Sequence, residues 1–348
     1  ACERPPRPVI PEVAMFLRIA AAVLLLGALT TPAAQAADSD VTWTVRTAAN
    51  DLGSDRTGFD YHLDPGGSVQ DALVVANRGD EPLTLGVYAA DGYTTDAGQF
   101  DVLTGDADSA HLGSWLTTGE SITVEPGATA DVPFTLTVPE NATPGDYVGA
   151  LVTSLAQPGD EPGITVDRRL GIRIDLRVGG ELAPALTVTD VQLGYHDTIN
   201  PAGTGDGTVS YTLHNTGNTV ISAQQEVEVS GPFGWFTVDA TDLPPAPELL
   251  PGESWDVSVP VSGVVPSFRI GAAVRVVPVV TDAAGSTSAL AAVPASAGTW
   301  AVPWSSLVLL VAVAGLVWWR IRHRRLRARR EDERVADRVR AALAGVAD

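Results

Sequence analysis

Hydrophobic and polar residues alternate in short runs along most of this chain. Between residues 41 and 294 the runs are broken by Gly, Pro, Asn or Asp at intervals of about 8–12 residues, a spacing typical of β-sandwiches and barrels. We expect strands near residues 41–47, 58–63, 68–77, 83–90, 121–124, 130–138, 145–155 and 169–178, and a second series near 186–194, 207–214, 220–230, 254–261, 270–280 and 286–294. This region is therefore predicted to be all-β, with little helical periodicity apart from a turn within 107–116.

Two turn motifs occur once in each series. A strand ends at Asn77, in Asn-Arg-Gly-Asp, and another ends at Asn215, in Asn-Thr-Gly-Asn. Asn and Gly readily adopt the positive φ angles of tight turns. Pro126-Gly127 and Pro251-Gly252 each precede a later strand, as expected of type II turns that start a hairpin. The repeat predicts two tandem immunoglobulin-like β-sandwiches, at residues 38–179 and 185–297.

Residues 302–319 form an uncharged run of a different kind. A helix of this length, rising about 1.5 Å per residue, spans about 27 Å, close to the hydrocarbon thickness of a bilayer. Trp304 lies at one end, Trp318 and Trp319 at the other, and Arg320 begins an arginine cluster; Trp favours membrane interfaces and arginine clusters stay cytoplasmic. We predict one transmembrane helix at 302–319, with these four residues at its interfaces and a basic cytoplasmic tail at 320–348. A buried core helix is the poorer alternative, because it would bring the arginine cluster beside a core.

Residues 15–36 have the form of a secretory signal peptide. Arg18 supplies the positive charge, residues 19–29 are apolar but too short to span a bilayer, and Ala34-Gln35-Ala36 is a small-residue cleavage site. Residues 1–14 precede Met15 and are rich in Pro and Arg, so we interpret them as an upstream extension. An uncleaved anchor is the alternative for 15–36. We expect a single-pass type I protein of the plasma membrane, with an extracellular ectodomain.

Composition narrows the class of partner. The net charge is −20 at pH 7, and the acids concentrate before residue 302 while the tail is basic. An acidic ectodomain repels phosphate backbones, so no nucleic acid partner is expected. Cys2 is the only cysteine and the sequence has no lysine, which excludes disulfides, a thiol nucleophile and lysine chemistry from the mature chain. Arginine in place of lysine throughout suggests a GC-rich bacterial genome.

The sequence carries no recognisable catalytic or metal-binding motif. Its histidines are scattered singly, it has no Gly-x-Ser-x-Gly elbow, and Asp106-Ala107-Asp108 lacks the glycine and distal glutamate of a calcium loop. We therefore expect no catalytic residues, no cofactor and no metal. A glycosidase with two carboxylates about 5–9 Å apart is the third-ranked hypothesis, because spacing alone cannot identify a pair among so many acids.

Residues 169–178 are the most distinctive candidate for a binding surface. One face of the predicted strand holds Leu170, Ile172, Ile174, Leu176 and Val178. Arg169, Arg173 and Arg177 share the other face, with Asp175 among them. Their forked donors suit carboxylates or phosphates of a wall polymer. The favoured alternative is pairing with acids on a neighbouring strand and protection of a sheet edge.

Several aromatic residues are candidates for contact with glycans. Tyr93 lies in a polar turn, Trp115 lies in a glycine-flanked segment, and Phe233, Trp235 and Phe236 cluster after Gly-Pro in a predicted loop. Flat aromatic faces match the C–H faces of sugars. Because large aromatics are mostly buried, packing in the core or within the loop is the favoured alternative. Three others alternate within strands and are expected in the core: Trp43, Phe134 and Trp255.

The order of motifs in the first sandwich resembles a known family. The motifs are Tyr-His-Leu-Asp-Pro-Gly at 61–66, Val74 to Asn77, Ala-Ala-Asp at 89–91 with Thr-Thr-Asp-Ala-Gly at 94–98, Trp115, the strand 121–126, and Thr-Val-Pro-Glu-Asn-Ala-Thr-Pro-Gly-Asp-Tyr-Val-Gly-Ala-Leu at 137–151. Over roughly residues 43–178 they resemble the peptidoglycan-binding domain of the WxL-interacting proteins of Gram-positive bacteria. Those proteins also have a signal peptide, two β-domains, one C-terminal membrane helix and a basic tail. The resemblance implies that the first sandwich contacts peptidoglycan.

Two functions follow as hypotheses. The leading one is a membrane-anchored surface protein whose first sandwich contacts peptidoglycan or another wall polymer, while the second sandwich is a spacer or a protein-docking module. The alternative is a surface scaffold or assembly factor that binds another surface protein, without glycan, by strand addition at an exposed sheet edge.

Overall fold

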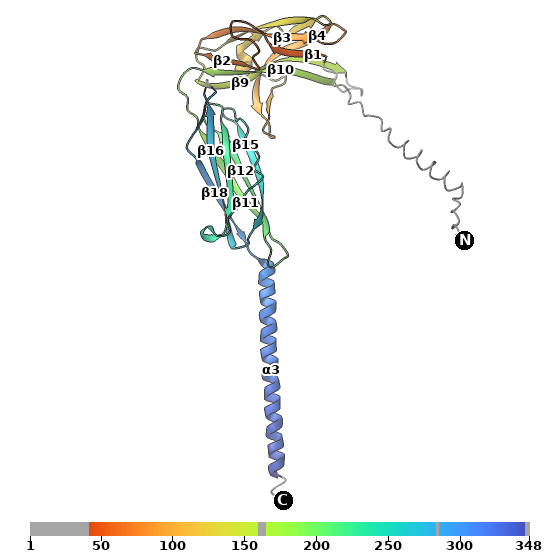
Figure 1. Ribbon diagram of the computed structural model, residues 1–348, viewed down its shortest axis with the longest axis vertical. Helices are drawn as coiled ribbons and strands as arrows, with labels where there is room; N and C mark the ends of the chain where they lie inside the picture. Colours follow the sequence, from red (N-terminus) through yellow and green to blue (C-terminus); the bar gives the residue numbers. More distant parts are fainter. Residues whose placement is uncertain (1–41, 159–164, 283–284, 345–348) are drawn as a thin grey trace, which may run out of the picture. The chain divides into compact units, whose positions relative to one another are not determined.

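The computed structural model describes residues 42–158, 165–282 and 285–344 (Figure 1). The predicted upstream extension and signal peptide, residues 1–36, lie outside the described residues. The first sandwich comprises β1 (Trp43–Thr47), β2 (Phe59–Leu63), β3 (Ser68–Asn77), β4 (Leu83–Thr94), β5 (Phe100–Val102), α2 (Leu112–Trp115), β6 (Leu116–Thr118), β7 (Ser121–Val124), β8 (Thr129–Thr137), β9 (Gly145–Pro158) and β10 (Thr165–Val178). Its sheets have the orders β1-β3-β8-β6 and β2-β10-β9-β4-β5, with β7 also paired to β4.

The second sandwich is followed by one long helix. It comprises β11 (Leu186–His196), β12 (Gly205–Asn215), β13 (Ser222–Ser230), the 3-10 turn η1 (Pro232–Gly234), β14 (Val238–Asp239), β15 (Ser254–Val264), β16 (Phe268–Thr281), β17 (Thr287–Ala289) and β18 (Val293–Ala301). Its sheets have the orders β11-β12-β15 and β14-β13-β16-β17, with β18 also paired to β16. The helix α3 spans Trp304–Ala344. The predicted class, two tandem immunoglobulin-like sandwiches and then one apolar helix, is confirmed.

Alternation along each strand builds the two cores. In β12, for example, Val209, Tyr211 and Leu213 are buried and the residues between them are more exposed, as expected where one face of a strand packs inward. Each such side chain, when fully buried, stabilises the fold by about 1.5–3 kcal/mol. The three aromatics predicted to be core, Trp43, Phe134 and Trp255, are all buried. With no disulfide expected, this burial is the main source of stability.

The repeated asparagine motif has the same structure in both sandwiches. Asn77 donates from Nδ2 to the carbonyls of Glu81 (2.8 Å) and Val124 (2.9 Å), and its Oδ1 accepts from the Gly79 amide (2.9 Å). Asn215 donates to the carbonyls of Thr219 (2.8 Å) and Leu249 (2.9 Å), and accepts from the Gly217 amide (3.0 Å). Both asparagines are buried. We call this arrangement the asparagine clasp; it ties the turn after β3 or β12 to a distant segment of the same sandwich.

The sequence prediction was wrong at the C-terminal side of the second sandwich. The strand expected at 286–294 is two strands, β17 and β18, and β18 continues past residue 297 to Ala301. Pro294, the last residue of the expected strand, lies within β18 opposite Arg275. Proline is tolerated in an edge strand where its missing N–H would face away from the ladder. The predicted helix at 302–319 exists, but α3 begins at Trp304 and continues into the basic tail.

Candidate binding cleft on the first sandwich

Asp91, near the end of β4, organises the segment that carries Trp115. Its carboxylate accepts hydrogen bonds from the backbone amides of Ala110, His111 and Gly113, each at 2.8 Å. Three donors on one carboxylate hold the short helix α2 against β4, and Leu112 of that helix is buried beneath it. The position of His111 and Trp115 at the surface is thus fixed by a buried anchor.

Three aromatic rings gather beside this anchor. The ring centroids of Trp115 and Tyr147 are 4.6 Å apart, and those of His111 and Tyr147 are 5.7 Å apart. The Tyr147 hydroxyl donates to the Thr143 carbonyl (3.0 Å) and lies 2.6 Å from the Thr143 hydroxyl. Trp115 and Tyr147 are half-buried, so part of each ring faces solvent. We call Trp115, Tyr147 and His111 the aromatic cluster.

A cavity of about 270 Å³ borders the aromatic cluster. From the first sandwich it is lined by Asp91, Gly92, His111, Thr143, Pro144, Gly145, Asp146, Tyr147 and Val148, and from the second by Gly217, Asn218, Leu250 and Pro251. Asn218 donates to the carbonyls of Pro144 (2.9 Å) and Glu181 (3.0 Å), and Asp146 accepts from the Val220 amide (2.9 Å). The cavity therefore combines aromatic surface, two carboxylates and fixed backbone groups, a mixture that suits a polar ligand with apolar faces.

The predicted arginine row on β10 is present, and each arginine already has a partner. Arg177 makes two hydrogen bonds to Asp146 (2.6 and 2.9 Å), which lies directly opposite on β9. Arg173 binds Asp175 (2.8 Å) and Glu248 (3.0 Å), and Arg169 lies 3.8 Å from Asp167. For Arg177 this is the cross-strand pairing favoured from the sequence. An external anion would have to displace these carboxylates.

One stretch of β10 is open on one side. The strand pairs with β9 along its whole length, whereas parallel strand β2 reaches only the residues from Ile174 to Val178. Within the described part of the chain, no strand pairs with the other side of 165–173. This edge carries Asp167 and Arg169, and charged residues on an edge disfavour indiscriminate strand addition.

Tyr93 lies outside the cavity lining. Its hydroxyl donates to Asp101 (3.3 Å) across the β4–β5 pair, and the negative charge of Asp101 raises the pKa of Tyr93. Trp115, the other aromatic residue predicted as a ligand contact in this sandwich, is not in the cavity lining either, but its ring packs against Tyr147, which is. Asp91 and Tyr147 had not been singled out. Asp91, Trp115 and Tyr147 all lie within the motifs that resemble the known family, but the spacing between them follows no general rule from which their contact could be predicted.

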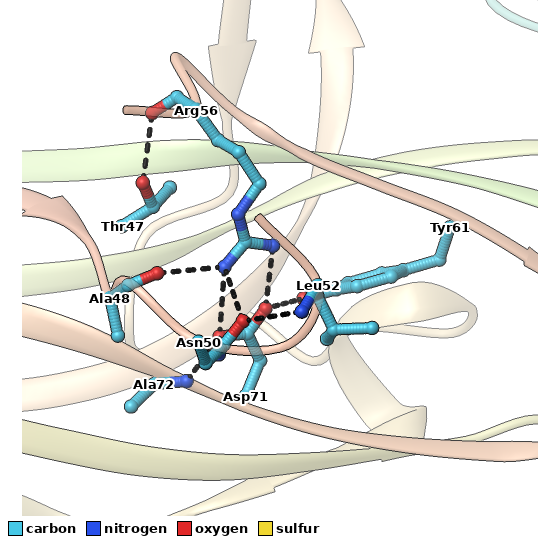
Figure 2. Close-up of polar contacts among 8 residues, drawn as sticks. All are labelled: Thr47, Ala48, Asn50, Leu52, Arg56, Tyr61, Asp71 and Ala72. Atoms are coloured by element: carbon cyan, nitrogen blue, oxygen red, sulfur yellow. Dashed lines mark hydrogen bonds and ion pairs between the residues drawn. The ribbon is translucent and has the colours of Figure 1, made fainter. Parts of the chain in front are cut away.

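A buried ion pair lies elsewhere in the same sandwich (Figure 2). Asp71 on β3 accepts from both terminal nitrogens of Arg56 (2.7 and 3.1 Å), from the Tyr61 hydroxyl (2.7 Å) and from Asn50 (2.6 Å). The Asp71 side chain is 0% exposed and that of Arg56 is 16% exposed. Arg56 also donates to the Ala48 carbonyl at 3.0 Å. The network fixes the connection between β1 and β2 on β3.

The network controls the ionisation of its own members. Burial alone would raise the pKa of Asp71, but hydrogen bonds from Arg56, Tyr61, the Ala72 amide and Asn50 outweigh it, so its pKa lies below the ordinary value. Burial, and then the hydrogen bond to Asp71, raises the pKa of Tyr61. Asp71 therefore stays charged and Tyr61 neutral near pH 7. A carboxylate with this many donors inside the protein is a structural group, because it has little capacity left for a ligand.

The loop with Phe233, Trp235 and Phe236 is at the surface, so packing of these residues in the core is wrong, although two of their rings contact each other within the loop. The three side chains are exposed, and the rings of Phe233 and Trp235 are 5.8 Å apart. This loop follows β13, whereas cavity residues Gly217 and Asn218 precede it. A strand of this length is about 30 Å long, so the loop and the cleft lie at opposite ends of β13.

The residues predicted to lie at the membrane interfaces are on α3. The stretch Trp304–Arg327 is long and apolar enough to cross a membrane, and the described residues bury none of it. Trp304, Trp318, Trp319 and Arg320 are exposed along it. Among the described residues, no group of three or more His, Cys, Asp or Glu side chains could hold a metal ion.

Known proteins resemble this chain only distantly. No protein-family model matches the chain, and no curated protein matches it. Among solved structures, a chaperone–tip adhesin complex of CFA/I fimbriae biogenesis matches with 10% identity and a TM-score of 0.36, over 75% of this chain and 99% of that chain. The class 5 fimbriae chaperone CfaA matches with 11% identity and a TM-score of 0.34, over 75% and 100%. A CsuC–CsuE chaperone–adhesion subunit complex of Acinetobacter baumannii matches with 10% identity and a TM-score of 0.34, over 72% and 98%.

Proposed function

We propose that this protein is a single-pass membrane-anchored surface protein that binds peptidoglycan or an associated wall polymer through the cleft of its first sandwich. Two immunoglobulin-like sandwiches followed by one apolar helix fit such an anchored surface protein. The binding role is supported by the aromatic cluster beside a cavity that also contains Asp91 and Asp146. Stacking of Trp115 and Tyr147 on sugar faces, with carboxylates accepting from hydroxyl groups, is the recognition that such a cleft allows.

The same proposal assigns no catalytic role to the chain. Asp91 accepts three backbone amides and Asp146 accepts Arg177 and Val220. These hydrogen bonds fix the orientation of the two carboxylates beside the cavity. The resemblance of the first sandwich to the WxL-interacting proteins, with their Gram-positive setting and type I orientation, supports the wall as the source of the ligand.

Retention on purified peptidoglycan tests the proposal. The full chain in detergent should sediment with the wall fraction, and Trp115→Ala should weaken that retention roughly tenfold, the loss expected when a contact aromatic is truncated. Trp235→Ala is the matched control, because Trp235 is an exposed aromatic at the far end of β13 from the cleft. Equal retention of the wild type and Trp115→Ala, or retention no higher than that of an unrelated acidic sandwich, contradicts the proposal.

The open edge of β10 favours a second candidate, a scaffold that docks an extended segment of another surface protein. Backbone groups along 165–173 are available for one more strand, and side-chain pockets beside an edge give such contacts specificity. A photo-crosslinking residue at Val166, which is exposed on this edge, should then give protein adducts in cells. The same crosslinker at Tyr93 is the control. Glycan adducts from a crosslinker at Trp115, without protein adducts from one at Val166, would support binding of the wall polymer and contradict the scaffold function.

A further inference from the structure

Large apolar side chains that face solvent gather in the second sandwich. They are Ile199, Phe233, Trp235, Phe236, Phe268 and Trp300, and we call them the apolar rim. Ile199 is 95% exposed, Phe233 is 92% exposed and Trp300 is 71% exposed. Large aromatics inside the same sandwich, such as Tyr211 and Trp255, are buried. A concentration of exposed apolar side chains of this kind marks an interaction surface.

Strand register places the rim at one end of the sandwich. Phe268 pairs with Ala301 and Arg269 with Trp300, at the last positions of β18. The final pair of β13 and β16 joins Ser230 to Gly271, and the Phe233 loop begins directly after it. The Gly231 backbone packs so closely against Ser267 that a Cβ there would lie 2.5 Å from the Ser267 hydroxyl. The loop, the start of β16 and the end of β18 are therefore neighbours.

The backbone is strained where it displays these rings. Phe233, Phe236 and Phe268 have φ angles of 61°, 55° and 70°, in the left-handed region that bulky residues rarely adopt. Among the described residues, only Asp55 and Asp190 share this property without being glycine. Strain of this kind persists at functional sites where the surroundings enforce it. Here it directs three phenylalanines outward when glycine would be the unstrained choice.

The rim lies close to the start of the membrane helix. Only two residues separate Ala301, the end of β18, from Trp304, the start of α3, so chain geometry limits that separation to about 11 Å. The Ser306 hydroxyl of α3 donates to the Pro201 carbonyl (2.6 Å), in the loop that carries Ile199. Trp304 is itself exposed and suited to a membrane interface. Whatever angle α3 takes, the rim stays near its first turn.

Charge at the rim differs from that of the chain. The segments 231–237, 264–271 and 297–306 contain no acidic residue, although the chain carries a net charge of −20. Arg269 lies beside Trp300 on the outer face, and no ion pair to it occurs among the described side chains. A guanidinium next to aromatic rings suits the phosphate layer of a lipid surface.

We propose that the apolar rim docks on the headgroup region of the bilayer that α3 enters, and so holds the second sandwich against the membrane. The bilayer is favoured over a protein partner because the rim is continuous with the membrane helix and because its segments carry no acid, apart from the Ile199 loop with Asp197. The proposal rests on α3 spanning a bilayer, as proposed above. The second sandwich then sets the height at which the first one stands above the lipid.

Site-directed spin labelling tests this docking in the full chain. Cys2→Ser removes the only cysteine, and single cysteines replace Phe233 in the rim, Gln224 near the other end of β13, and Gly315 within α3. Gln224 is exposed on the same strand and serves as the matched control. The protein is placed in phosphatidylcholine–phosphatidylglycerol nanodiscs with one chain per disc, so that self-association cannot shield a label. Accessibility to oxygen, which partitions into lipid, is compared with accessibility to a water-soluble nickel chelate.

We expect the oxygen-to-nickel ratio at position 233 to be several-fold higher than at 224, and the ratio at 315 to be higher still. A ratio at 233 equal to that at 224, with 315 shielded, overturns the docking and leaves the membrane anchor intact. Nickel access at 315 overturns the anchor and the docking together. Shielding at 233 that appears only in discs with several chains assigns the rim to self-association and also overturns the docking.

Discussion

The two sandwiches share the asparagine clasp and differ in what lies six residues before it. Aligning Asn77 with Asn215 places Asp71 opposite Val209, and both are buried. Asp71 holds Arg56, Tyr61 and Asn50, whereas Val209 belongs to an apolar core in which burial raises the pKa of Tyr211 to about 12. One fold thus accommodates an ion pair or an apolar side chain at the same position, and at this position the first sandwich depends on ionisation whereas the second does not.

The sandwiches also differ in what they display. The clasp spans 47 residues from Asn77 to Val124 but 34 residues from Asn215 to Leu249. The longer span includes β5, α2 and β6, and it carries Trp115 of the aromatic cluster. The second sandwich lacks this segment among its described residues and exposes the apolar rim instead. The difference suggests a division of roles, with the ligand cleft on one sandwich and membrane contact on the other.

The largest effect is expected at the buried ion pair. Asp71→Ala should destabilise the first sandwich by about 3–5 kcal/mol, because it leaves the Arg56 guanidinium without its buried partner. Hydrogen exchange of the full chain in urea, followed by mass spectrometry, measures each sandwich separately. The second sandwich should be unaffected.

The double variant Asp71→Leu with Arg56→Met sharpens this prediction. It replaces both charges by apolar groups, as Val209 does in the second sandwich, and should recover much of the lost stability. An Asp71→Ala variant as stable as the wild type would show that the network contributes nothing to the fold.

Next in size is the asparagine clasp. Asn77→Ala and Asn215→Ala should each cost about 1–3 kcal/mol, because each removes the hydrogen bonds that a buried asparagine side chain makes to two carbonyls. Each loss should be confined to its own sandwich in the same exchange experiment. If the two variants lost very different amounts of stability, the asparagine clasp would not have the same role in the two sandwiches.

Acid should affect the first sandwich more than the second. The pKa of Asp71 is lower in the folded chain than its ordinary value of about 3.9, so its contribution is complete above that value and is lost as pH falls through the folded pKa. The stability difference between the wild type and Asp71→Asn should therefore shrink below about pH 4. Urea unfolding between pH 7 and 3 measures it, and a difference that grows on acidification would contradict the shift.

The smallest effect is expected at the rim. Phe233→Gly should leave the second sandwich as stable as the wild type or raise its stability by up to about 1 kcal/mol, because the exposed ring buries little and glycine relieves the left-handed φ. The thermal unfolding midpoint measures this change. A clear loss of stability would mean that Phe233 packs within the fold and is not held out for a partner.

Local patterns made the sheets and the two asparagine turns predictable from the sequence, but not the hydrogen bonds of the clasp to distant carbonyls. Strand alternation and the turn chemistry of Asn77 and Asn215 act over a few residues, so they appear directly in the sequence. The strand expected at 286–294 was wrong because the sequence pattern showed neither the break between β17 and β18 nor the continuation of β18 to Ala301.

The ion pair and the cleft depend on contacts distant in sequence. Asp71 shares the inward positions of β3 with Leu73 and Val75, but a charged residue at such a position gives no sign in the sequence of the partner that would allow its burial. Its partner Arg56 comes from an irregular connection with no periodicity. Tyr147 and Asn218 line the cavity from segments that only the tertiary structure brings together. The exposure of Phe233 could not be predicted either, because composition alone favours burial of aromatics.

The topology of the chain is tested most directly by labelling intact cells with a membrane-impermeant thiol reagent. Single cysteines at Leu52 in the first sandwich, Gln224 in the second and Leu326 on α3, all exposed and in the Cys2→Ser background, report each side of the membrane. We predict that positions 52 and 224 react in intact cells and that position 326 reacts only after permeabilisation. Labelling of position 326 in intact cells, or of 52 and 224 only after permeabilisation, would contradict a surface protein anchored by α3.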